Sequence, residues 1–294
     1  MDSIQTPNGD APKLSEWVKQ VVPTETVLRH PPLLPSAMTS LLKDSEDRSL
    51  DETVELVEHD ETTSARILLW ANSASSGAVE GITDLKTAIM RVGVGSMVQI
   101  TLLSKFKSFL TVPLKTYGIS GEDFWMHAFA TAVAAESIEA DLSFRVSPEC
   151  FVAGLVHDVG KIFIDRYQEV FASAPMDRIE NGDGELARHQ QEVDMYGLGH
   201  ATIGASVARH WGFGPTVVDC LAHHHDTIDG NSPEVKVLQL ANQIAKSIGR
   251  KGGGDLVDDE LNQLLRSLQL DMHDYEKIRN RSRNKLTKLA GTLK

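Results

Sequence analysis

Apolar residues recur every three or four positions along most of this chain, and that spacing predicts helices almost without interruption from Ser36 to Gly249. The chain contains no series of alternating apolar and polar runs joined by Asn-Gly turns, the pattern of β-hairpins. An all-α fold, a bundle of many helices, is therefore expected. The later predicted helices span 84–91, 96–110, 122–140, 149–158, 185–195, 200–210, 215–225 and 233–249. Thr83 is the predicted cap of the helix over 84–91.

Composition narrows the class of protein further. The chain has 294 residues, of which 41% are hydrophobic, and this favours a globular domain over a disordered or collagen-like chain. Its net charge is −12, which argues against general binding of nucleic acid. Residues 271–294 hold seven basic and three acidic residues, so an acidic body precedes a basic tail. Only that tail could attract a polyanion.

The two ends of the chain are predicted to flank one helical body. Residues 1–23 are interpreted as a leader with a short helix over 13–22. A glycine cluster near Gly252 predicts a linker, so residues 251–294 are a linker followed by a helical basic tail. Between Val257 and Leu268 the leucines mark an amphipathic helix that docks either on the body or on a second subunit, giving a homodimer.

The sequence also bears on the compartment. Cys150 and Cys220 lie in apolar stretches without CxxC spacing, so both are predicted to be buried, reduced thiols. The first residues carry no apolar signal region, and no run approaches the roughly 18 apolar residues of a membrane span. A cytoplasmic protein without membrane contact is expected.

Histidine is the residue type that points to chemistry, since the chain has eleven. A single histidine on an apolar helix is most often an ordinary core or surface residue. Several together with an aspartate are different, because neutral imidazoles and ionised carboxylates are ligands of divalent transition metals, and one aspartate can bridge two ions. The candidate ligands on predicted core-facing helices are His127, His157, Asp158, His200, His224 and His225. The other histidines, at 30, 59, 189, 210, 223 and 273, are interpreted as bystanders.

The two adjacent pairs are constrained by helix geometry. Neighbouring side chains on a helix diverge by about 100°, so both can reach one site only near a helix end. Each pair precedes a helix break, at Gly160 and at Asp226. Lys161 follows the first pair and could meet a phosphate oxygen, although a plain surface role is equally compatible. The chain has no Walker A loop, dinucleotide fingerprint or GxSxG elbow.

The dipeptide His157-Asp158 resembles the HD superfamily of metal-dependent phosphohydrolases, which takes its name from it. The run from His157 to Lys161 and the spacing to the later histidines are similar to the HD-GYP branch, whose members hydrolyse cyclic di-GMP at iron or manganese sites. Two features depart from that branch. No Gly-Tyr-Pro follows His225, and the position of a second metal-binding aspartate is best matched by Asn242.

These departures, together with the N-terminal half, resemble the HDOD domain, an HD-related output domain of bacterial signalling proteins. The similarity is carried by Ala65 to Ser73, Trp125-x-His127, Gly154 to Lys161 and the histidines that follow, and it covers residues 24–250. It implies an HD-domain-like helical bundle in a regulatory protein. Many family members have lost the metal ligands and are thought to act by binding a partner, whereas this chain keeps most of them.

Two hypotheses follow from the resemblance. The first is a signal-transduction module that holds one or two divalent ions, iron or manganese, at the histidine cluster and binds a regulatory protein. The second is a phosphohydrolase acting on a nucleotide or cyclic dinucleotide, in which Asp158 and Lys161 are catalytic. Asn242 is the weakest of the implied ligands because it brings no charge. The first hypothesis is preferred, and a nucleic-acid-linked regulator using the basic tail comes third.

Overall fold

The computed structural model describes residues 13–21, 50–72, 81–171, 185–249 and 259–293. These ranges are helices and connecting loops without a named strand, and one isolated antiparallel bridge joins Leu114 to Ile119. The expected all-α fold is confirmed. The start of the predicted helical region at Ser36 and most of the predicted glycine linker lie outside the described residues.

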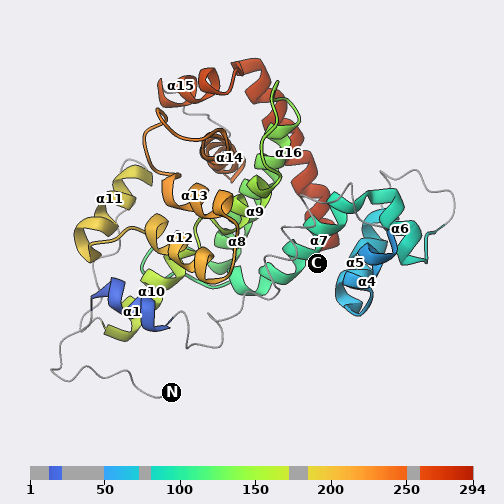
Figure 1. Cartoon of the computed structure of the whole chain (residues 1–294), viewed down its shortest axis with the longest axis horizontal. Coiled ribbons are helices and arrows are strands. Elements are labelled where there is room, and N and C mark those ends of the chain that lie inside the picture. Colours follow the sequence, from blue (N-terminus) through green and yellow to red (C-terminus); the bar gives the residue numbers. More distant parts are fainter. Residues whose placement is uncertain (1–12, 22–49, 73–80, 172–184, 250–258, 294) are drawn as a thin grey trace.

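The helices form a large body with a smaller lobe beside it (Figure 1). The lobe contains α4 (Leu50–Glu58), α5 (Glu61–Ala71) and α6 (Leu85–Val92), and α7 (Val94–Leu110) leads from it into the body. The body is built from α8 (Gly121–Glu139), α9 (Glu149–Val156), α10 (Gly160–Phe171), α11 (Glu185–Tyr196), α12 (His200–His210), α13 (Pro215–His223) and α14 (Pro233–Gly249). Helix α1 (Leu14–Val21) packs on α10 through Trp17, whose ring meets those of Tyr167 and Phe171 edge-on.

Helix α8 is the centre of the body, and its small residues set how closely its neighbours approach. It packs against α9, α14 and α16 (Met272–Thr292), and its alanines are almost fully buried. Gly154 on α9 lies so close that an added Cβ would come within 2.9 Å of the Ala132 backbone. The same closeness recurs where α10 meets α12, because a Cβ on Gly160 would lie 2.0 Å from the carbonyl oxygen of His200. These contacts fix the relative positions of the helices that carry the histidines.

The helix ends agree with the sequence apart from one cap. Asp60 caps α5 as the pattern suggests, and its side chain accepts a hydrogen bond from the backbone of Thr63. The prediction that Thr83 caps the next helix was wrong. Asp84 does so, with its carboxylate 2.7 Å from the backbone nitrogen of Thr87, because α6 starts one residue later than predicted.

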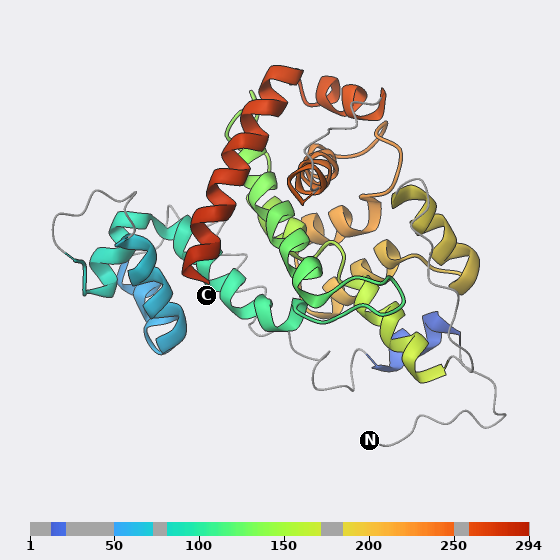
Figure 2. The ribbon, with the colours of Figure 1, turned by 180° about the vertical axis from the view of Figure 1, so that it is seen from behind.

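The C-terminal helices pack on the body of the same chain (Figure 2). The apolar face of α15 (Asp259–Ser267) is buried with α14, so the docking predicted for this helix is on its own body. Basic residues of α16 pair with acidic residues of α8 and the turn after it: Lys277 and Arg281 contact Asp141, and Lys285 contacts Glu136. Part of the basic tail is thus neutralised by the acidic body.

Two further expectations concern the cysteines and the membrane. Cys150 and Cys220 are both free and buried, as predicted. Within the described ranges no single helix is both long and apolar enough to cross a membrane, although α6 and α7 together pass on length and composition across a bend of 107°.

Candidate metal centre

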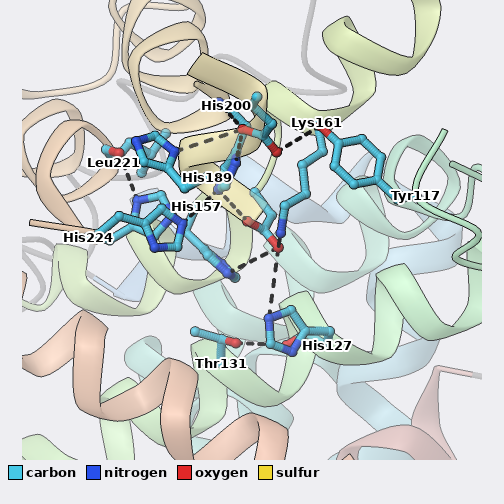
Figure 3. Close-up of polar contacts among 12 residues, drawn as sticks. Tyr117, His127, Thr131, His157, Lys161, His189, His200, Leu221 and His224 are labelled. Atoms are coloured by element: carbon cyan, nitrogen blue, oxygen red, sulfur yellow. Dashed lines mark hydrogen bonds and ion pairs between the residues drawn. The ribbon is translucent and has the colours of Figure 1, made fainter. Parts of the chain in front are cut away.

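The candidate ligands converge from several helices on one region of the body (Figure 3). His127 projects from α8, His200 begins α12, and Asn242 lies on α14. Both adjacent pairs lie just beyond helix ends, as the sequence analysis required, since α9 ends at Val156 and α13 at His223. The structure therefore brings together side chains that are more than 100 residues apart in the sequence.

Asp158 is the centre of this arrangement and is only 3% exposed. Its Oδ2 atom lies 2.6 Å from Lys161 Nζ and 3.4 Å from His157 Nε2, while His127 Nε2 is 3.9 Å away. Its other oxygen, Oδ1, lies 3.3 Å from His200 Nε2. We call Asp158 with His127, His157, His200 and His224 the Asp158 pocket. Its donor atoms form two groups of three that share Asp158, each within 4.8 Å: one with His127 and His157, the other with His200 and His224.

Two of these histidines are oriented by the backbone. His157 Nδ1 is 2.8 Å from the carbonyl oxygen of Gly154, and His224 Nδ1 is 2.8 Å from that of Leu221. A carbonyl only accepts, so each Nδ1 carries the proton and each Nε2 keeps its lone pair. These two Nε2 atoms and Asp158 Oδ1 are buried and have no hydrogen-bond partner within the described part of the chain. These three atoms fit a metal ion, because such an ion would be the partner for their unused lone pairs.

The charges of the pocket also suit a cation. Burial lowers the pKa of His157 to about 3 and that of His127 to about 4, so both rings are neutral near pH 7. Burial alone would raise the pKa of Asp158, but His157, Lys161 and His200 outweigh it and hold that pKa well below its usual value. The pocket thus presents neutral imidazoles and one ionised carboxylate, the forms in which these groups bind metals.

Glu192 on α11 is a second buried carboxylate, and the sequence analysis did not identify it. Its Oε2 atom lies 2.6 Å from His200 Nδ1 and accepts a hydrogen bond from the His200 backbone at 2.7 Å, while Tyr117 donates its hydroxyl to Oε1. Burial would raise the pKa of Glu192, but His200 and His189 lower it strongly. Glu192 therefore fixes the His200 ring and also satisfies the first backbone N–H of α12.

The charged groups in contact here do not balance. Asp158 and Glu192 bring two negative charges; the ammonium of Lys161 pairs with Asp158, and His200 contacts Glu192. Burial and Lys161 lower the pKa of His200, yet the two carboxylates raise it by more, so the net shift is upward. A bound cation would add the positive charge that two buried carboxylates and one ammonium leave unbalanced.

His189, interpreted above as a bystander, lies in the cluster. Its donor atom falls within 4.8 Å of those of His200 and His225. We call His189, His200 and His225 the imidazole trio. A signal for it was present in the sequence, because His189 and Glu192 are three residues apart and share one face of a predicted helix. Asn242, 4% exposed, hydrogen-bonds to His127 at the opposite end of the cluster and brings no charge.

Comparison with models of protein families identifies the family of this chain. The model of the HDOD domain matches residues 31–227, which is about two thirds of the sequence. The chain belongs to the HDOD family. The match lies inside the predicted HDOD domain of residues 24–250, whose outer bounds stay a prediction.

Relatives of this HDOD protein include an uncharacterised protein of Treponema pallidum (strain Nichols). It is 25% identical over 199 residues, which are 66% of this chain and 37% of that protein. The chain thus spans well under half of the length of this relative.

Two solved structures show the same fold. An HDOD domain protein of unknown function from Geobacter sulfurreducens aligns with a TM-score of 0.67 and 21% identity, over 96% of this chain and 97% of its own. A protein from Shewanella amazonensis SB2B, provisionally described as a phosphohydrolase, aligns with a TM-score of 0.67 and 22% identity, over 96% and 98%. At these identities the comparison establishes the HDOD architecture alone.

Proposed function

We propose that this HDOD protein is a bacterial, cytoplasmic regulatory module that holds a divalent metal ion in the Asp158 pocket and acts by binding a protein partner. The observation that carries the metal is the set of buried, unpartnered atoms: His157 Nε2, His224 Nε2 and Asp158 Oδ1. Burying such atoms without a partner costs about 1–3 kcal/mol each, and an ion removes that cost. A mixed set of nitrogen and oxygen donors suits Fe²⁺ or Mn²⁺.

Three features favour binding over catalysis. Lys161 Nζ already lies against Asp158 Oδ2, where a second cation would compete with it. Asn242 offers an amide where a charged ligand would hold that cation more strongly. Two cavities, of about 620 and 690 Å³, lie over α12 and α13 and are lined by other residues, including Arg209 and His223. In the metal pocket His157, Asp158 and His200 are buried, and the side chain of His127 is 23% exposed.

A metal-dependent phosphohydrolase is the second candidate, and one observation favours it. The two oxygens of Asp158 face different histidines, His157 on one side and His200 on the other, as in a carboxylate that bridges two ions. Bound ions would polarise a phosphoryl oxygen and acidify a water. In that case Lys161 would release Asp158 and neutralise phosphate charge, and Asp158 would hold the ions.

A phosphoester assay separates the two candidates. Protein loaded with Mn²⁺ or Fe²⁺ is incubated with a panel of nucleotides and cyclic dinucleotides, and release of phosphate or linear dinucleotide is measured. The module predicts that metal binds without turnover. Turnover in the wild type that is lost in Asp158→Asn would overturn it in favour of the enzyme.

Partner binding is tested separately. A partner captured by the tagged chain is purified and its affinity remeasured with both proteins pure. The module predicts similar affinities for the wild type and Asp158→Asn, and loss of partner binding together with hydrolysis would contradict it.

A further inference from the structure

The imidazole trio of His189, His200 and His225 differs from the Asp158 pocket in the donors it offers. Its three side chains come from α11, from the start of α12 and from the turn after α13. Ring centroids of His189 and His225 are 4.8 Å apart and nearly parallel, and those of His200 and His225 are also 4.8 Å apart. All three donor atoms are imidazole nitrogens, whereas the pocket includes the carboxylate of Asp158.

We propose that the imidazole trio is a second metal position, selective for ions that prefer nitrogen ligands, such as Zn²⁺ or Co²⁺. Three imidazoles are a complete protein ligand set for such an ion and leave a fourth position for water or another ligand. Hard ions such as Mn²⁺ and Mg²⁺ prefer carboxylate oxygen, so they are drawn to Asp158 instead.

The contacts around His200 support the trio. Glu192 accepts the Nδ1 proton of His200, so the lone pair of that ring is on Nε2, 2.9 Å from His225 Nε2. A carboxylate behind a ligating histidine is the usual way to orient the ring and raise its basicity. Glu192 is 0% exposed and is held in turn by Tyr117.

A second observation concerns His189. Its Nδ1 atom is buried without a hydrogen-bond partner among the described residues, 3.8 Å from Glu192 Oε2. Gly199 provides the space for this ring, because a Cβ at that position would lie 2.1 Å from His189 Cε1. The His189 side chain is 19% exposed, whereas His157 and His200 are 0% exposed. The trio therefore reaches toward solvent on the α11 side, while the pocket does so at His127, whose side chain is 23% exposed.

The two positions share one donor atom, the Nε2 of His200. His200 Nε2 has one lone pair and can bind one ion at a time. When the trio uses it, the Asp158 pocket keeps the group formed by His127, His157 and Asp158. An ion held by His127, His157 and Asp158 therefore leaves the trio able to bind its own ion, whereas an ion held by His200 and His224 competes with it.

Titration with Co²⁺ and Mn²⁺ tests the proposal on the full chain. Wild-type protein is expected to show the intense visible bands of four-coordinate Co²⁺. Because the pocket can also take Co²⁺, the trio is tested in Asp158→Asn: there, adding His189→Ala or His189→Gln should abolish the bands and weaken Co²⁺ binding at least tenfold, since changes behind a ligand alone cost about 10–100-fold. The matched control is His59→Ala, which removes a surface imidazole that is 87% exposed.

Mn²⁺ gives the reciprocal readout. Binding of Mn²⁺ should survive in both His189 variants and fail in Asp158→Asn, which keeps its Co²⁺ bands. Circular dichroism confirms that each variant is folded, and partly exposed His189 makes its replacement tolerable. Unchanged Co²⁺ bands and affinity when either His189 change is added to Asp158→Asn, or no Co²⁺ binding by the wild type, would overturn the trio. Unchanged Mn²⁺ binding in Asp158→Asn would instead overturn the proposed pocket.

Discussion

The Asp158 pocket and the imidazole trio share His200 but differ in donor type and charge. The pocket is built around a carboxylate that is 3% exposed and already paired with Lys161. The trio contains only imidazole rings, with its carboxylate, Glu192, behind His200 rather than beside the ion position. His200 thus lies between two carboxylates: Asp158, which is itself a candidate ligand, and Glu192, which acts through a hydrogen bond to the His200 ring.

This difference shows how one scaffold can present two ion positions with different preferences. In the pocket the negative charge lies on a candidate ligand, Asp158, which favours hard ions. Its burial is compensated by the ammonium of Lys161. In the trio the charge acts through a hydrogen bond, which favours ions that bind nitrogen strongly. Variants can therefore be chosen to affect the Asp158 pocket, the imidazole trio or both, and each should change metal binding or stability in a different way.

Replacing Asp158 by asparagine should have the largest effect on stability. The buried Lys161 ammonium loses the carboxylate 2.6 Å away, and breaking one half of a buried pair costs about 3–5 kcal/mol. Urea unfolding with chelator present measures this cost without metal. The double variant Asp158→Asn/Lys161→Met should recover most of it, and a single variant as stable as the wild type would contradict the buried pair.

Gly160→Ala should disturb both ends of the cluster at once. The added Cβ would lie 2.0 Å from the His200 carbonyl oxygen, so α10 and α12 must separate, at a cost of about 1–3 kcal/mol or more. Urea unfolding and metal titration measure the loss. Gly204→Ala is the matched control on the same contact, because its nearest neighbour is 3.5 Å away, in ordinary van der Waals contact. Equal stability of the two variants would refute the close approach.

Removing metal should lower the melting temperature, and the effect of Mn²⁺ should distinguish the Asp158 pocket from the imidazole trio. At an ion concentration 100 times its dissociation constant, binding to the folded state adds about 2.7 kcal/mol. Mn²⁺ should therefore raise the melting temperature of the wild type and of His189→Ala, but not that of Asp158→Asn. Identical melting of chelated and Mn²⁺-loaded wild type would be incompatible with the pocket.

Gly199→Ala should give the smallest effect and act on the trio alone. The new methyl group occupies the place of the His189 ring, which must rotate away, whereas the backbone at Gly199 has an ordinary extended conformation. We expect a loss of Co²⁺ affinity of about tenfold, or about 1.4 kcal/mol, with Mn²⁺ binding unchanged. Calorimetric titration of both ions measures this change in affinity. A loss of affinity for Mn²⁺ alone would contradict the assignment of His189 to the trio.

Helical periodicity predicted the fold because it depends on local spacing, and most helix ends lie within one or two residues of those expected. The histidine pairs could be placed at helix ends for the same reason, since Gly160 and Asp226 break the pattern nearby. The cap of α6 was misplaced by one residue, because Thr83 and Asp84 are adjacent and both can cap.

His189 and Glu192 could not be assigned in the same way. Their roles depend on how α11 packs against the start of α12, a tertiary contact that Gly199 permits and that periodicity does not encode. The position of Asn242 beside His127 likewise follows from the packing of α14 on α8. Local patterns thus identified the ligands at helix ends, while those brought in by helix packing required the structure.

Elemental analysis of the protein purified without chelator tests the central claim most directly. The account predicts a transition metal ion bound to the wild-type chain, with the manganese or iron content greatly reduced in Asp158→Asn and the metal content unchanged in His59→Ala. A wild-type protein that is purified without metal and takes up neither Mn²⁺, Fe²⁺ nor Zn²⁺ on titration would contradict it.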